Sequence, residues 1–246
     1  MSVVQHILPV LALLPLAQPA LSQAADPILP DFAAADFSTP RANPYLPMTL
    51  GQSITVMAGS VADGETVPEL AVRTIIGPGP VLMGVQTTTA VDETFLSGHL
   101  VERTLDYLAA DSAGNIWYLG EDVENFVYDA AGILTGTDNH SAWLAGVDGA
   151  LPGITMPADL TVDVVLFQEH APAQEALDYA RIVETGLTIQ TPDGSYSDVI
   201  KFYEASLSEL DLREYKYYAP GVGMIRAEED LDETLANPGV ILEIQP

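Results

Sequence analysis

Cysteine is absent from the 246 residues of this chain. Its absence excludes disulfide bonds, thiolate metal sites, a cysteine nucleophile and an acyl anchor on an N-terminal cysteine. The stability of the fold must therefore come from core packing or from bound ions.

Positive charge is scarce, because eight Lys and Arg stand against 35 Asp and Glu, which gives a formal net charge of −27. Nucleic acids and anionic membrane surfaces would be repelled, so neither is expected as a partner. Two interpretations of the acidic excess stay open. It is either a solvated surface, as in adaptation to salt, or a means of concentrating divalent cations, for which Ca²⁺ is the candidate.

Signatures of catalysis are missing as well. The sequence has no G-x-S-x-G elbow, no G-x-x-x-x-G-K-[ST] phosphate loop and no G-x-G-x-x-G dinucleotide motif. His99, His140 and His170 are too scattered for an H-x-x-x-H or H-x-H metal motif. With 35 acidic residues some carboxylate pair always looks suitable, so none can be singled out as a glycosidase pair. We therefore assign no catalytic residue and no certain cofactor, and we expect a non-enzymatic protein.

The first 24 residues have the length and apolar character of a secretory signal peptide, and Ser22 and Ala24 are small, as its cleavage site requires. Prolines interrupt the apolar run, so no membrane anchor is expected. The mature chain should be periplasmic or secreted. Residues 25–50, rich in Pro and Ala, predict an extended lead-in, and residues 51–246 predict a single β-rich domain.

From about residue 53 the chain consists of short runs of β-branched and aromatic residues separated by glycine-containing turns. This spacing is typical of consecutive antiparallel hairpins. Segment 140–160, rich in Gly and Pro, predicts a long ordered loop. The following APAQEALDYARIV places Ala and Leu on one helical face and predicts one short helix near 172–183. The expected fold class is mainly β, a curved antiparallel sheet or incomplete barrel.

The stretch LAADSAGNIWYLGED, residues 108–122, is either a cation loop or a hairpin turn. Its spacing fails to match an EF-type calcium loop, whereas Asp111 and Gly114 suit a tight turn. Carboxylates flanking such a turn would still repel each other on paired strands unless they are exposed or bridged by a cation. The candidate metal ligands are Glu102, Asp106, Asp111, Glu121 and Asp122.

Large aromatic side chains on short strands either fill a core or line a binding face. The candidate ligand contacts are Trp117, Tyr118 and Trp143. In EYKYYAPGVG, Tyr215 and Tyr217 share one strand face, while Glu214 and Tyr218 share the other with Lys216. Core packing with a polar rim accounts for this alternation without a ligand.

Four blocks carry a resemblance to a known group: DSAGNIWYLGED, WLAGVDGALPGITMP, FQEHAPAQEALDYA and EYKYYAPGVGMI. In this order they resemble exported bacterial proteins of unassigned activity that share D-x-x-GN-x-WY-x-GED, W-x-AGVDGA-x-PGI and KYYAPGVG blocks. The resemblance covers roughly residues 43 to 228 and implies export, but neither a reaction nor a ligand. The succession of strands and turns that ends in YYAPGVG also resembles that of exported proteins that fold a curved antiparallel sheet over a helix, as lipoprotein carriers do.

Three function hypotheses follow. The first is an exported, acidic, non-enzymatic binding or structural protein, monomeric and associated with divalent cations such as Ca²⁺. The second is a carrier of an apolar small ligand in the concave face of the sheet, and the third is a hydrolase. A concave face lined with carboxylates favours the first, and one lined with Trp, Tyr and Leu favours the second.

We expect the mature N-terminus at Ala25, because Ser22 and Ala24 satisfy the small-residue requirement of the secretory peptidase. Terminal sequencing of the exported protein checks this expectation. Exported material that retains Met1 would contradict cleavage.

Overall fold

The computed structural model describes residues 26–61 and 69–246. The expected signal peptide of residues 1–24 and the cleavage site after it lie outside the described residues. The elements, in chain order, are η1 (Phe32–Ala34), β1 (Ser53–Val61), β2 (Glu69–Leu82), β3 (Val85–Leu96), β4 (His99–Ala110), β5 (Ile116–Tyr128), β6 (Leu134–Asp138), β7 (Trp143–Leu144), β8 (Leu151–Met156), β9 (Val165–Phe167), β10 (Glu169–His170), η2 (Pro172–Gln174), β11 (Asp178–Thr191), β12 (Gly194–Ser206), β13 (Arg213–Ala219), β14 (Gly223–Glu229) and β15 (Val240–Ile244).

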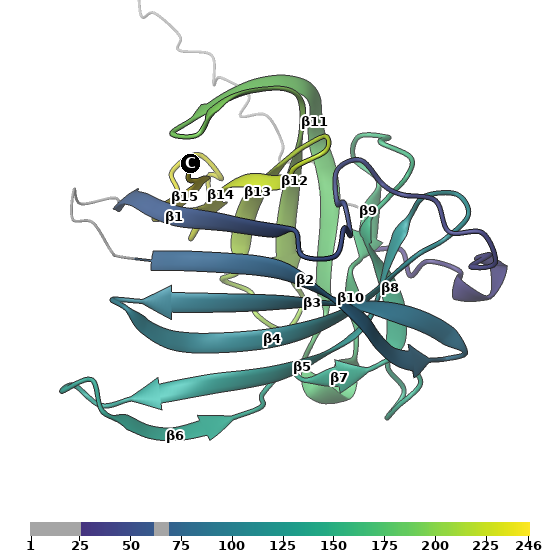
Figure 1. Ribbon diagram of the computed structural model, residues 1–246, viewed down its shortest axis with the longest axis horizontal. Coiled ribbons are helices and arrows are strands. Elements are labelled where there is room, and N and C mark those ends of the chain that lie inside the picture. The colour runs from purple at the N-terminus through teal and green to yellow at the C-terminus, as the bar shows by residue number, and fades with distance from the viewer. Residues whose placement is uncertain (1–25, 62–68) are drawn as a thin grey trace, which may run out of the picture.

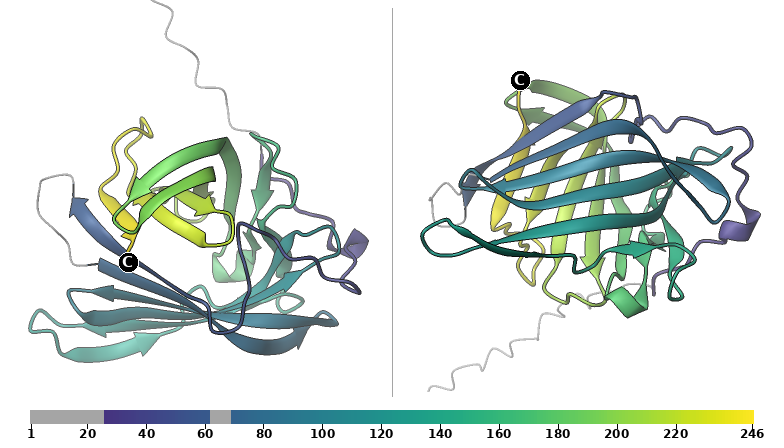
Figure 2. Two further views of the ribbon diagram at one scale, coloured as in Figure 1. Left: turned by 45° about the horizontal axis from the view of Figure 1, so that its top comes forward. Right: turned by 60° about the horizontal axis from the view of Figure 1, so that its bottom comes forward.

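The strands form one antiparallel sheet in the order β10-β8-β5-β4-β3-β2-β1-β15-β14-β13-β12-β11-β9, with β6 and β7 paired to β5. Strands β1 to β5 make one half and strands β11 to β15 the other, and the two halves join where β1 pairs with β15. Figures 1 and 2 show the halves curving toward each other around a shared interior. The expected fold class, mainly β with a curved sheet or incomplete barrel, is confirmed.

The far edges of the two halves meet at segment 165–170. Phe167 in β9 pairs with Tyr179 of β11, and Glu169 in β10 pairs with Pro152 of β8. Only Gln168 separates β9 from β10. This short stretch therefore bonds to both halves and nearly closes the barrel.

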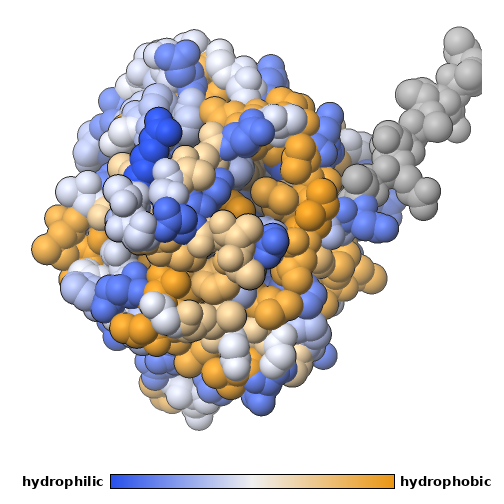
Figure 3. Space-filling view, turned by 90° about the vertical axis from the view of Figure 1, so that its right-hand side faces the viewer, coloured by the Kyte–Doolittle hydropathy of each residue, from blue (hydrophilic) through white to orange (hydrophobic). Residues whose placement is uncertain are grey.

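The lead-in lies along one end of the barrel, where it covers β5 and β9. Ile28 bonds the free edge of β9, donating to the carbonyl of Val165 and accepting from the amide of Phe167. This end, viewed in Figure 3, presents many apolar side chains, and Ile28 itself is 57% exposed.

The expected helix near 172–183 is wrong. Residues 172–174 form a single 3-10 turn, and β11 begins at Asp178. The alanine spacing fits a helix, but Ala180 and Ile182 also fit the alternation of a strand, and both are buried. Pairing of β11 with β9 and β12 supplies backbone partners on both sides, and this tertiary gain overrides local propensity.

The expected loop of residues 140–160 contains two short strands. β7 and β8 lie beside β5 and continue the sheet toward the closing segment. Gly153 allows this approach, because a Cβ built on it would lie 2.2 Å from the carbonyl oxygen of Gln168. The glycine richness of this segment thus reflects close backbone packing as well as turns.

We predict that Gly153→Ala destabilises the fold by about 1 to 3 kcal/mol, because the added methyl group forces β8 away from the closing segment. Chemical denaturation measures the change. The matched control is Gly136→Ala in exposed β6, where a Cβ meets nothing within 4 Å. Equal midpoints for the two variants would contradict a tight seam at Gly153.

Candidate functional site

A cavity of about 250 Å³ lies between the two halves of the sheet. Alternate residues of each strand point into it, as the pleat of a strand requires. One wall is apolar and is formed by Leu46, Pro47, Ile54, Val56, Leu108 and Met224. The other wall is polar and is formed by Arg73, Asp92, Asp106, Tyr118, Lys216, Tyr218 and Glu229.

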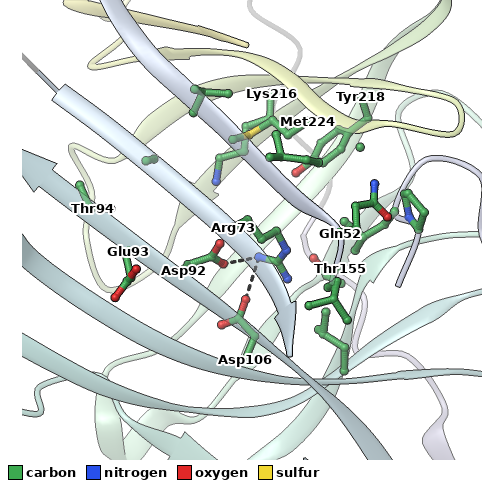
Figure 4. Close-up of a pocket in the computed structure, with 18 of the residues that line it drawn as sticks. Gln52, Arg73, Asp92, Glu93, Thr94, Asp106, Thr155, Lys216, Tyr218 and Met224 are labelled. Carbon is green, nitrogen blue, oxygen red and sulfur yellow. Dashed lines mark hydrogen bonds and ion pairs between the residues drawn. The ribbon is translucent and has the colours of Figure 1, made fainter. Parts of the chain in front are cut away.

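Arg73 of β2 organises the polar wall. Its Nη1 donates to Asp92 of β3 and, at 2.9 Å, to Asp106 of β4 (Figure 4). Burial raises the pKa of Asp92 well above its usual range, and the neighbouring Asp106 adds to this effect although Arg73 opposes it. Arg73 therefore pairs with two carboxyl groups that lie close together on β3 and β4.

Lys216 of β13 forms the second ion cluster of this wall. Its Nζ lies 2.7 Å from Glu204 and 3.1 Å from Glu214. Burial alone would lower the pKa of Lys216, but the two carboxylates raise it well above its usual range. Arg73 and Lys216 are thus each held in place by two carboxyl groups, which lie on neighbouring strands or, for Glu214, on the same strand.

A shared hydroxyl links the cavity to a second group of carboxylates. The Tyr118 hydroxyl lies 2.6 Å from Asp106 and 2.8 Å from Glu121. A hydroxyl donates only one proton, so one of these contacts requires a protonated carboxyl. Burial, and then the charge of Asp106, raises the pKa of Glu121 to about 8. Glu121 is therefore the protonated partner at neutral pH.

Beyond Glu121 lies a cleft rich in carboxylates. It contains no Lys or Arg among the described residues, and its acidic members are Glu102, Glu121, Glu169, Glu175, Asp178 and Glu209. Burial raises the pKa of Glu169 well above its usual range and that of Asp178 to about 6. Within residues 26–61 and 69–246, no set of His, Asp and Glu side chains has the arrangement of a metal site.

The five candidate metal ligands do not come together. Asp106 and Glu121 are buried, and Glu121 lines the carboxylate cleft together with Glu102, which is exposed. Asp122 is exposed on the opposite face of β5. Asp111 lies at the far end of β4, so at most three of the five residues share a region.

Asp111 closes the turn between β4 and β5. One carboxylate oxygen accepts the amides of Ala113, Gly114 and Asn115, and the other accepts the side chains of Asn115 and Trp117. Burial would raise the pKa of Asp111, but these hydrogen bonds lower it. Gly114 has a φ of +97°, which a turn of this kind requires. The hairpin interpretation of this stretch is therefore confirmed, and the carboxylate is fully occupied.

Two of the three aromatic candidates are core residues. Trp117 is 3% exposed and packs edge-on against Phe32 of the lead-in. Trp143 is also 3% exposed, and its indole donates to Glu169 at 3.2 Å. Tyr118 alone of the three lines the interior cavity.

Sequence reasoning missed the central residues Arg73 and Asp92. It placed Lys216 and Tyr218 on the correct strand face, but that face is the interior of the barrel and not a polar rim. Alternation along a strand shows which residues share a face, yet it does not show which face becomes buried. No sequence signal connects Arg73 in β2 with Tyr218 in β13.

Comparisons with known proteins leave the family open. No family model matches the chain. Among curated proteins, UDP-N-acetylmuramoylalanine–D-glutamate ligases from Burkholderia multivorans and Burkholderia vietnamiensis are 31% and 30% identical over 131 residues, or 47% of this chain. The chain spans only about a quarter (26%) of these ligases, and it lacks a phosphate-loop motif.

Two solved structures show a distant likeness to this chain. One, from Bacteroides fragilis, is described as an exported protein with a YmcC-like fold; the match has a TM-score of 0.43 and 14% identity, and covers 82% of this chain and 97% of that one. The other is described as a lipoprotein from Parabacteroides distasonis, with the same TM-score and identity and coverage of 83% and 98%. A likeness at this level extends to neither ligand nor activity. In the described part of the chain no helix has the length and apolar character needed to span a bilayer.

We predict that the protein loses stability as the pH rises from about 5 to about 8.5, in part through Glu121. The pKa of Glu121 is raised by folding, so its contribution is complete below its unfolded pKa and disappears as the pH rises through about 8. Each pKa unit of difference is worth about 1.4 kcal/mol. Glu121→Gln should therefore show a smaller fall in thermal midpoint over this range.

Asp122→Asn is the matched control, because Asp122 is the next residue of β5 and is exposed on its other face. Its pH profile should follow that of the wild type. If Glu121→Gln and the wild type lose the same amount of stability, Glu121 is not protonated in the folded protein.

Proposed function

We propose that this chain is an exported, non-enzymatic binding protein that holds a small molecule in the cavity between the two halves of its sheet. One observation carries the proposal, namely a cavity of about 250 Å³ whose lining combines apolar side chains with the ion clusters of Arg73 and Lys216. Ligand sites in proteins are concave and mainly apolar, with a few polar groups that fix orientation. The volume suits a molecule below the usual size of a drug.

The sequence hypotheses contrasted a concave face lined with carboxylates and one lined with apolar and aromatic side chains. The lining of this cavity contains both kinds of side chain. Leu and Met side chains favour a carrier of an apolar molecule, and Asp92 and Asp106 beside them are already paired with Arg73. The carrier hypothesis, placed second from the sequence, is therefore our leading one. Binding of a divalent cation stays a prediction, restricted to Glu102, Asp106 and Glu121.

The charge pattern supports binding without catalysis. Both oxygens of Asp106 accept hydrogen bonds, from Tyr118 and from Arg73. Asp92 contacts the same guanidinium. Carboxylates held in this way position a guanidinium and a hydroxyl, whereas a hydrolase requires a carboxylate that is available to water or substrate.

We predict that the neutral apolar dye N-phenyl-1-naphthylamine binds in this cavity and that Ala71→Leu weakens its binding at least about tenfold, because the larger side chain fills the apolar wall. Fluorescence titration of the full chain measures the affinity. The control is Val72→Leu, the next residue of the same strand, whose side chain points to the opposite face.

Thermal midpoints of both variants show whether the fold is retained. If folded Ala71→Leu binds the dye as tightly as Val72→Leu does, the ligand site is not the interior cavity and the proposed function fails.

A further inference from the structure

Free hydrogen-bond donors face the interior cavity. Arg73 uses Nη1 for both of its carboxylate partners, and its Nε is buried without a partner. Nη2 makes no hydrogen bond to any residue that the structure describes, and it is not among the buried unpartnered atoms, so it reaches the open space of the cavity. The guanidinium therefore presents free N–H groups to whatever occupies that space.

Tyr218 supplies a second free donor. It is 9% exposed, and within residues 26–61 and 69–246 no group hydrogen-bonds its hydroxyl. Figure 4 shows the Tyr218 hydroxyl and the Arg73 guanidinium directed into the same space between β2 and β13. The hydroxyl is not among the fully buried atoms without a partner, so, like Arg73 Nη2, it reaches the open space and is free to donate to an oxygen acceptor there.

Most acceptors of the polar wall are already used, and the remaining carboxyl, that of Glu229, has a pKa that burial raises to about 8. Asp106 accepts from Tyr118 and Arg73, and Glu204 accepts from Lys216 at 2.7 Å. Asp92 accepts from the same guanidinium nitrogen as Asp106 does, and burial raises its pKa well above the usual range. A cationic head group would find few free oxygens here, whereas an oxygen acceptor would find the guanidinium and the phenol together.

We infer that the ligand carries a carboxylate or carbonyl oxygen at one end, bound by Arg73 Nη2 and the Tyr218 hydroxyl, with an unbranched apolar chain against Leu46, Ile54 and Met224. This inference rests on the proposed function of the same cavity. The guanidinium fork suits two carboxylate oxygens, and an apolar chain suits the wall opposite.

The experiment displaces the bound dye from the full chain with octanoate and with octylamine, which have chains of equal length and opposite charge. Salt of about 0.15 M limits long-range electrostatics. The net charge of −27 attracts the amine and repels the carboxylate, so this comparison works against the inference. We expect octanoate to displace the dye at a concentration at least about tenfold below that of octylamine.

Tyr218→Phe removes only the hydroxyl and should weaken octanoate about tenfold more than it weakens the dye, whose affinity is measured for each variant. Tyr217→Phe is the matched control, because its hydroxyl contacts Glu228 at 3.0 Å on the outer face. Octylamine that competes as well as octanoate, or equal octanoate affinities for the two variants, would overturn the inference. Either result leaves the proposed function intact as long as Ala71→Leu still weakens dye binding. If Ala71→Leu has no effect on dye binding, the proposed function itself is refuted.

Discussion

Closure of the sheet at segment 165–170 is the constraint on which the rest of this structure depends. Because β9 pairs with β11 and β10 pairs with β8, the two halves of the sheet have a common interior. Every long strand then has one face inside, so each second residue must be compatible with burial. An open sheet of the same strands would leave Arg73, Asp92 and Lys216 in water, where their interactions would be weak.

Burial changes what these charged groups can do. A charge withdrawn from water is tolerated when it is paired and hydrogen-bonded, and Arg73 and Lys216 each contact two carboxylates. Carboxylates that lack a cation, such as Glu121 and Glu169, have raised pKa values instead. The interior is therefore less negative at neutral pH than its composition suggests, which is why an acceptor ligand is compatible with so acidic a chain.

Both halves of the sheet contribute apolar and polar side chains to the lining of the cavity. Ion pairs connect neighbouring strands of one half, as Arg73 in β2 does with Asp92 in β3, and they stiffen that half. The apolar wall includes Leu46 from the lead-in and Met224 from β14, so it depends on how the lead-in and the C-terminal half pack. A ligand in this space would contact both halves, and its binding would stabilise their closure.

The amino-acid sequence by itself determined the antiparallel β class, the turn at Asp111–Gly114 and the sharing of one face by Glu214, Lys216 and Tyr218, because these depend on neighbours in the chain. It did not determine the state of residues 172–183, where helical and strand periods both fit and only the pairing of β11 decides. Nor could it identify the cavity, since Arg73 and Tyr218 are far apart in sequence and meet only when the barrel closes. Only the tertiary structure decided which face of each strand is inside, because a period of two is the same for a polar rim and for a polar interior.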